Sequence, residues 1–205
     1  MKRYIILATC ILAGCSSNST EYPQFNTTYS KNYQQKALEK FGNAEFSGDA
    51  KSINGLGLMY EVGFGVPQNI NKAKELWKKA GDMGYGSGYC NLARTYLNDI
   101  KTYRIAFDYH HKATFTKEKN HCGLTGLGIA YLYGYGVKPN LNTAENYFLT
   151  AIQAKSENGD DEYNLGIIAQ QKGQNAEATK WFEAAKQKGF DSVDSDEWLI
   201  NTLGL

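Results

Sequence analysis

Cysteine and histidine are the residue types in this 205-residue protein that could bind a metal or form a disulfide, and most of them fall in one region. They are Cys90, His110, His111, His121 and Cys122. Their spacing fits no zinc motif, because the sequence has neither Cys-x-x-Cys nor two histidines four residues apart. We therefore expect no metal site and no cofactor, and we expect the histidines to pack against their neighbours.

Nucleophilic catalysis has little support in the sequence. A serine activated by lysine typically occurs as Ser-x-x-Lys, and this pattern is absent; the nearest approximation is Thr28-x-x-Lys31. The Gly-x-Gly segments at 63–65 and 134–136 do not extend to Gly-x-Gly-x-x-Gly, so they indicate loops that end helices rather than phosphate sites. The sequence thus predicts no catalytic residues.

The beginning of the sequence has the layout of a secretory signal. A basic tip precedes an apolar run that is too short to span a bilayer permanently, and the run ends in Leu12-Ala13-Gly14-Cys15. These four residues resemble the lipobox of bacterial lipoproteins. The resemblance implies that residues 1–14 are removed and that Cys15 is acylated, which would anchor the protein to a membrane.

The cleaved protein would begin with a polar, flexible tether over residues 15–31. By the sorting rule of bacterial lipoproteins, Ser16 after the cysteine implies the outer membrane, with the body of the protein in the periplasm. Loss of Lys2 and Arg3 lowers the 22 basic residues to 20, against 21 acidic ones, so no basic field for nucleic acid remains. A content of 42% hydrophobic residues suffices for one domain with a proper core.

An internal repeat runs through the sequence. Residues 56–66 are matched by residues 127–137 at a constant offset of 71, which corresponds to two units of about 36 residues. Two further copies are eroded. The expected parts are a half repeat at about 33–47, repeats at about 51–84, 87–117, 122–155 and 160–189, and a closing helix at about 192–203.

Each unit has the pattern of two amphipathic helices. Leu56 and Tyr60 are spaced to share one face of the first helix, and the small and apolar residues of 73–80 form one stripe on the second. The glycine after the leucine costs about 1 kcal/mol of helix propensity relative to alanine. We therefore expect that glycine to face the alanine stripe and to allow close packing. His110 takes the place of Trp77, which predicts a packed imidazole.

The pattern Leu-Gly-x-x-Tyr-x-x-Gly-x-Gly-Val, followed by Ala-x-x-aromatic-x-x-Ala, occurs in full at residues 53–84 and 124–155. It resembles the Sel-one-like repeats (SLR), relatives of the tetratricopeptide repeats with a longer, glycine-marked loop. The resemblance implies an all-α fold over residues 32–203: a right-handed α-solenoid of antiparallel helix pairs, in which the first helix of each unit lines a concave face.

The comparison with tetratricopeptide repeats directs one set of side chains into the concave groove. They are Asn54, Leu58, Glu61, Arg94, Asn98, Ile129, Leu132, Tyr133, Tyr163 and Gln170. An apolar stripe exposed in this groove would favour a peptide or protein partner, unless the ends of the short solenoid curl enough to bury it.

Cys90 and Cys122 would be the remaining thiols of the cleaved protein, in an oxidising compartment. In an ideal stack they lie on helices roughly 8–10 Å apart and one turn of about 5 Å out of step, which exceeds the roughly 7 Å Cα limit for a disulfide. A longer loop before the third full unit could close the gap. The sequence leaves the bonded and the free form open.

The sequence favours a non-enzymatic, membrane-anchored scaffold of the bacterial envelope that binds another protein on its concave face. One alternative is an immunity lipoprotein that neutralises a bacterial toxin. Another is an enzyme acting on the cell wall or on β-lactams, an activity credited to some cysteine-rich SLR proteins. We expect a variant with Arg94→Glu and Leu132→Glu to stay folded and to lose its partner.

Overall fold

A computed structural model describes residues 27–116, 121–154 and 159–190. Within these ranges the regular secondary structure is helical, without a strand. The helices are α2 (Thr27–Phe41), α3 (Ala44–Ser47), α4 (Ala50–Val62), α5 (Ile70–Asp82), α6 (Gly86–Arg94), the 3₁₀ helix η1 (Ile100–Thr102), α7 (Tyr103–Thr114), α8 (His121–Tyr133), α9 (Leu141–Gln153), α10 (Asp160–Gln171) and α11 (Asn175–Gln187). The predicted all-α fold class is confirmed. The predicted signal segment, acylated Cys15 and closing helix at 192–203 lie outside the described residues.

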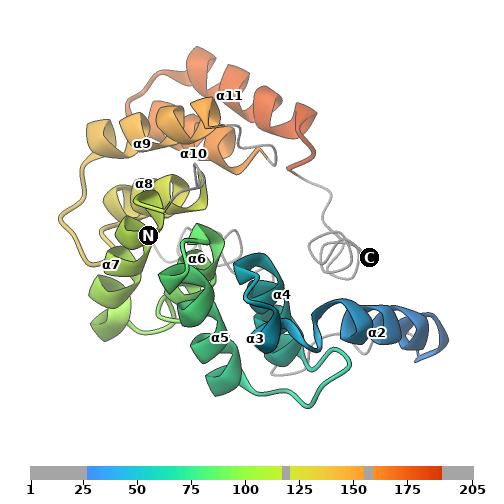
Figure 1. Cartoon of the computed structure of the whole chain (residues 1–205). Helices are drawn as coiled ribbons and strands as arrows, with labels where there is room; N and C mark the ends of the chain where they lie inside the picture. Colours follow the sequence, from blue (N-terminus) through green and yellow to red (C-terminus); the bar gives the residue numbers. More distant parts are fainter. Residues whose placement is uncertain (1–26, 117–120, 155–158, 191–205) are drawn as a thin grey trace.

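The helices from α4 to α11 form a stack of four consecutive pairs. Within each pair the two helices pack against each other, and the second helix also packs against the first helix of the next pair. The first helices approach one another too, since α6 contacts α8 and α8 contacts α10. In Figure 1, α4, α6, α8 and α10 follow the inside of an open arc, with the second helices outside them. The architecture is therefore an α-solenoid with the first helices on its concave side.

The half repeat before the first full unit consists of α2 and the short α3. Ala37 and Phe41 on α2 are buried in the same core cluster as α4 and α5. Gly42 and Asn43 separate the two helices, and the side chain of Asp49 then caps α4 by accepting a hydrogen bond from a backbone N–H. The second helix expected here is thus present, but it is broken near its end.

Glycine and asparagine define the loops of the two complete units. Gly63 and Gly134 follow α4 and α8 with φ of 76° and 80°, a conformation that glycine adopts without steric cost. Asn69 and Asn140 then begin α5 and α9, and each side chain accepts a hydrogen bond from the backbone N–H three residues on. The unit between them lacks this loop, and its first helix α6 has only nine residues.

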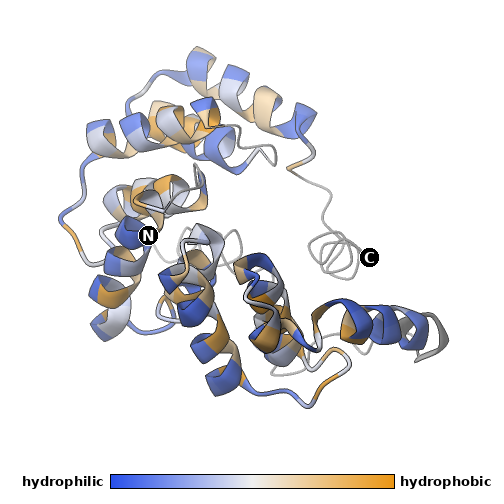
Figure 2. Ribbon diagram, in the orientation of Figure 1, coloured by the Kyte–Doolittle hydropathy of each residue, from blue (hydrophilic) through white to orange (hydrophobic). Residues whose placement is uncertain are grey.

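In three of the four pairs an aromatic ring of the second helix lies in the seam, and a glycine on the first helix makes room for that ring. A Cβ atom on Gly57 would lie 2.5 Å from the Trp77 ring nitrogen, and one on Gly128 would lie 2.7 Å from the Phe148 ring. The corresponding glycine of the last unit faces Phe182. The expected close approach of these glycines to the second helix is present, and the nearest atoms that they meet are those of the aromatic ring in the facing stripe rather than of its alanines (Figure 2 colours the helices by hydropathy).

A second glycine on the same helices faces the ring of the preceding unit. Gly55 meets the Phe41 ring, and Gly126, which lies 71 residues later, meets the imidazole of His110. The first helix of these units thus receives one ring from each side. Any side chain at either glycine would have to displace a ring from the core.

Candidate partner-binding face

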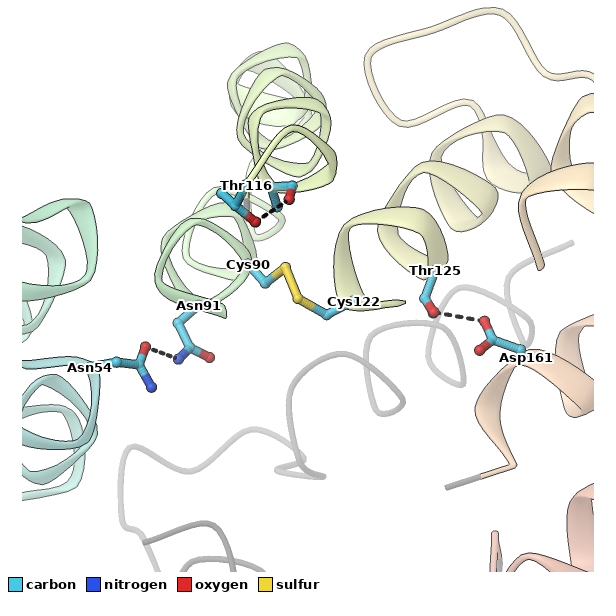
Figure 3. The surroundings of a disulfide bond; sticks show 8 residues. Asn54, Cys90, Asn91, Thr116, Cys122, Thr125 and Asp161 are labelled. Atoms are coloured by element: carbon cyan, nitrogen blue, oxygen red, sulfur yellow. Dashed lines mark hydrogen bonds between the residues drawn. A yellow bond between two sulfur atoms is a disulfide. The ribbon is translucent and has the colours of Figure 1, made fainter. Parts of the chain in front are cut away.

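One side-chain link joins the first helices at each junction between full units, on the concave side (Figure 3). These junction links are the Asn91–Asn54 hydrogen bond between α6 and α4 (2.9 Å), the Cys90–Cys122 disulfide between α6 and α8, and the Thr125–Asp161 hydrogen bond between α8 and α10 (2.7 Å). In each link the residue of the earlier unit lies two positions before the signature leucine, which is Leu56, Leu92 or Leu127. The same repeat position therefore ties each unit to the next.

A buried ion pair adds a second connection between α4 and α6. Arg94 Nη2 donates to both carboxylate oxygens of Glu61, at 2.6 and 2.7 Å. The Glu61 side chain is 7% exposed and that of Arg94 is 23% exposed, and the guanidinium lies 5.7 Å from the centre of the Trp77 ring. A carboxylate buried this deeply needs a counter-ion. Arg94 therefore serves the junction, because its Nη2 donates to the carboxylate of the neighbouring unit.

Cys90 and Cys122 form a disulfide with a Cα–Cα distance of 6.2 Å. This separation is within the roughly 7 Å limit that a disulfide requires. The ideal stack considered from sequence placed the two backbones farther apart. At this junction α6 and α8 approach more closely than that stack assumed, which decides between the two forms that the sequence left open.

Burial removes the apolar part of the predicted groove from the surface. Leu58 and Ile129 are 2% exposed and Leu132 is 5% exposed, and all three belong to the core clusters. Asn54 and Glu61 are also buried, in the junctions described above. The prediction of an open apolar stripe is therefore wrong at these positions. The first helices pack on one another and bury the side chains that the comparison with tetratricopeptide repeats assigned to the groove.

This burial also corrects the expected behaviour of the groove variant. Arg94→Glu would set a second carboxylate against the buried Glu61, and Leu132→Glu would place a charge in the core. The double variant is therefore expected to unfold, and it cannot report on binding.

The rest of the predicted groove remains accessible. Asn98 and Gln170 are exposed, and Tyr133 and Tyr163 are half-buried. Burial raises the pKa of Tyr133 to about 12, so its hydroxyl stays protonated at physiological pH. Tyr163 stacks on Phe190 with ring centres 4.2 Å apart. Asn98 lies in the turn after α6, whereas Tyr133 and Gln170 lie on α8 and α10. The predicted groove residues that remain accessible are thus amides and tyrosines.

The histidines and cysteines of the described residues lie in different surroundings. His110 is buried at 4% exposure, whereas His111 lies exposed on α7. His121 begins α8, next to the disulfide-bonded Cys122. Among residues 27–116, 121–154 and 159–190, no group of three or more His, Cys, Asp or Glu side chains is arranged to hold a metal ion. The same ranges include no helix long and apolar enough to cross a membrane.

Comparison with known proteins finds sequence similarity in three of the repeats. The family model of the Sel1 repeat matches residues 50–85, 123–156 and 160–190. It leaves out the unit with the shortened α6 and no glycine-marked loop. A putative sel1-like repeat-containing protein L21 from Acanthamoeba polyphaga mimivirus is 33% identical over 121 residues, which are 58% of this chain. The match spans 21% of that relative's length.

Solved structures include similar folds. The crystal structure of a Sel1 repeat protein from Oxalobacter formigenes matches with a TM-score of 0.63 and 20% identity, over 77% of this chain and 70% of that one. The crystal structure of c5321, described as a protective antigen of uropathogenic Escherichia coli strains with an SLR fold, matches with a TM-score of 0.36 and 16% identity, over 91% of this chain and 45% of that one.

Proposed function

We propose that this protein is a lipid-anchored, non-enzymatic scaffold of the bacterial envelope that binds another protein on its inner face; the match of the Sel1 repeat model to residues 50–85, 123–156 and 160–190 supports the proposal. The observation that carries the proposal is the inner face itself, on which a side-chain link joins the first helices at each junction between full units. A surface that is already held in one shape loses little conformational entropy when a partner binds. Such a face suits a binding role.

The chemistry of the accessible inner face favours an extended segment of the partner. The amides of Asn98 and Gln170 each supply donors and an acceptor, which can pair with the backbone C=O and N–H groups of such a segment. Tyr133 and Tyr163 add half-exposed rings, and tyrosine is enriched among the residues that dominate binding energy. The proposed site is therefore polar with aromatic anchors.

Photocrosslinking tests the binding face. A photoreactive amino acid at Asn98 or Gln170 should form a covalent adduct with the partner in intact cells. The same amino acid at Asp108 on α7 or Glu177 on α11 is the control, because both residues are exposed on second helices. Adducts of one protein at the first two positions and not at the controls support the proposal. Equal adducts at all four positions, or adducts at the controls alone, would contradict it.

The anchor is a separate part of the proposal. The lipobox residues before Cys15 support acylation, and the polar residues that follow Cys15 support a tether, which is shorter than the expected 15–31 because α2 begins at Thr27. Ser16 supports the outer membrane with the body in the periplasm. Cys15→Ser should prevent acylation and move the protein from the membrane fraction to the soluble fraction. Ser16→Asp is a control that keeps the acylation site and should change only the destination membrane. A Cys15→Ser protein that stays in the membrane fraction would contradict the anchor but not the binding face.

A further inference from the structure

The Cys90–Cys122 disulfide differs in kind from the other two junction links. The links before and after it are hydrogen bonds, which a change of redox state leaves intact. The disulfide occupies the corresponding place between α6 and α8, and it is the covalent link of the solenoid within the described residues. Reduction would therefore break the side-chain link at this junction and leave the links at the other two junctions in place.

The disulfide is open to a reductant. Both cysteines are half-buried rather than enclosed in the core. Figure 3 places the disulfide between the middle of α6 and the beginning of α8, in the same row as the other junction links. Partial exposure of the cysteines is what attack by a small dithiol requires.

The outer side of the same junction does not need the disulfide. Gly123 on α8 packs against the backbone of α7 at His110 and against Ala113, and Gly126 receives the His110 ring. His110 and Ala113 are buried. Loss of the disulfide leaves this packing in place, so α8 stays attached to α7 while its contact with α6 is released.

On the inner side of the junction, α6 shares a core cluster with Ile129 and Ala130 of α8 through the buried Ala93, and within the described residues the disulfide is the side-chain bond between the two helices. Helix α6 is the shortest of the first helices, with nine residues against twelve or thirteen in the others. The bonds that its Asn91 and Arg94 side chains form run back to α4 and not forward to α8. With the sulfurs separated, α6 remains with the first unit, and the gap to α8 can widen around the α7–α8 packing.

We propose that the Cys90–Cys122 disulfide is a redox-controlled clamp on the curvature of the solenoid. A dithiol reductant transfers two electrons and two protons to the disulfide. The S–S bond breaks, two thiols form, and the reductant closes its own disulfide. The inner side of the junction then opens, and the two halves of the solenoid turn apart about the α7–α8 seam. This step does not depend on the anchor or on the identity of a partner.

Hydrogen exchange measured by mass spectrometry on the full-length protein in detergent micelles tests the clamp. After treatment with dithiothreitol, amides of α6 and of the first half of α8 should lose protection, while those of α5 and of α9 to α11 should keep it. Far-UV circular dichroism should stay unchanged, and reoxidation should restore the original protection. A Cys90→Ser, Cys122→Ser variant should show the open pattern from the start and should not respond to dithiothreitol.

A neighbouring junction link provides the matched control. Thr125→Val removes the hydrogen bond to Asp161 without touching the cysteines, so its effect should lie between α8 and α10 and should be the same with and without dithiothreitol. Three outcomes would overturn the clamp: unchanged protection of α6 and α8 after complete reduction, loss of the helical signal throughout the protein, or a disulfide that stays intact in excess dithiothreitol. A failure of the proposed binding face would appear in the crosslinking experiment and leave this result untouched.

Discussion

His110 is a residue at which a change of protonation should affect stability. Burial lowers its pKa from 6.5 to about 4, because a charged imidazole in this seam would lose its hydration. As the pH falls below 6.5, the unfolded protein takes up a proton that the folded protein does not accept until about pH 4. The free energy of unfolding should therefore fall across this window, by about 3 kcal/mol in total. Urea unfolding at a series of pH values would measure the slope.

The control for this prediction is His110→Phe, which places at this position the ring type that Phe148 supplies in the next unit. Its free energy of unfolding should lose the part of the pH dependence that lies between 6.5 and 4, while the part due to carboxylates remains. Identical pH profiles for the two proteins would show that His110 is not the group responsible.

The Glu61–Arg94 pair should also be sensitive to a single substitution. Arg94→Ala leaves the buried Glu61 carboxylate without its counter-ion and should lower the free energy of unfolding by about 3 kcal/mol. Because the arginine is partly exposed, water reduces this cost, and we expect the lower end of the usual range. Replacing both partners, with Glu61→Gln and Arg94→Met, should recover most of the loss. Chemical denaturation of Glu61→Gln, Arg94→Met and the variant with both changes forms a double-mutant cycle, in which purely additive losses would contradict a coupled pair.

The sequence predicted the position of some of these residues on the inner face, but not the contacts that they form. The comparison with tetratricopeptide repeats selected Asn54, Glu61 and Arg94 as inner-face residues, and they do lie at the contacts between first helices. The comparison treated these residues as available to a partner. The residue spacing within one helix does not show how closely the first helix of the next unit packs against it. The bond between Asp161 and Thr125 is a contact between units, which spacing within one unit cannot predict.

At the level of helices, the glycine seams should resist even a methyl group. Gly128→Ala would gain helix propensity of about 1 kcal/mol, but the added Cβ would lie 2.7 Å from the Phe148 ring, which is fully buried. We expect a net loss of about 1–3 kcal/mol from this overpacking. Thermal or chemical unfolding would measure it. Combining Gly128→Ala with Phe148→Leu, which removes the ring edge, should cost less than the sum of the two single changes.

The helix pairs themselves could be predicted, because their apolar spacing and glycine-marked loops depend only on local sequence. The nine-residue α6 could not be placed as well, since its unit lacks the Gly-x-Gly loop that marks where a first helix ends. The sequence also did not predict which side chain each seam glycine contacts. Both an alanine stripe and an aromatic ring lie on the facing helix, and only the relative rotation of the two helices decides which one meets the glycine.

At the level of the whole molecule, the links follow the concave side. Hydrogen bonds, the ion pair and the disulfide connect first helix to first helix, and the two core clusters run along the seams between them and the second helices. Within the described residues, the side-chain links between first helices thus lie along the concave side of the solenoid. Its curvature should respond to changes at these links more than to changes on the outer helices.

The same architecture predicts that a destabilising substitution in one unit unfolds mainly that unit and its neighbours. Trp77 is fully buried, and Trp77→Ala should cost about 3–5 kcal/mol. Because each unit of a solenoid contacts mainly its neighbours, the cost should appear as lost hydrogen-exchange protection in α4 to α6, while α10 and α11 keep theirs. Phe182→Ala, which empties the seam beside the glycine of the last unit, is the mirror control and should expose α10 and α11 first. If either variant lost protection uniformly from α4 to α11, the protein would unfold as one cooperative block and the nearest-neighbour description would be wrong.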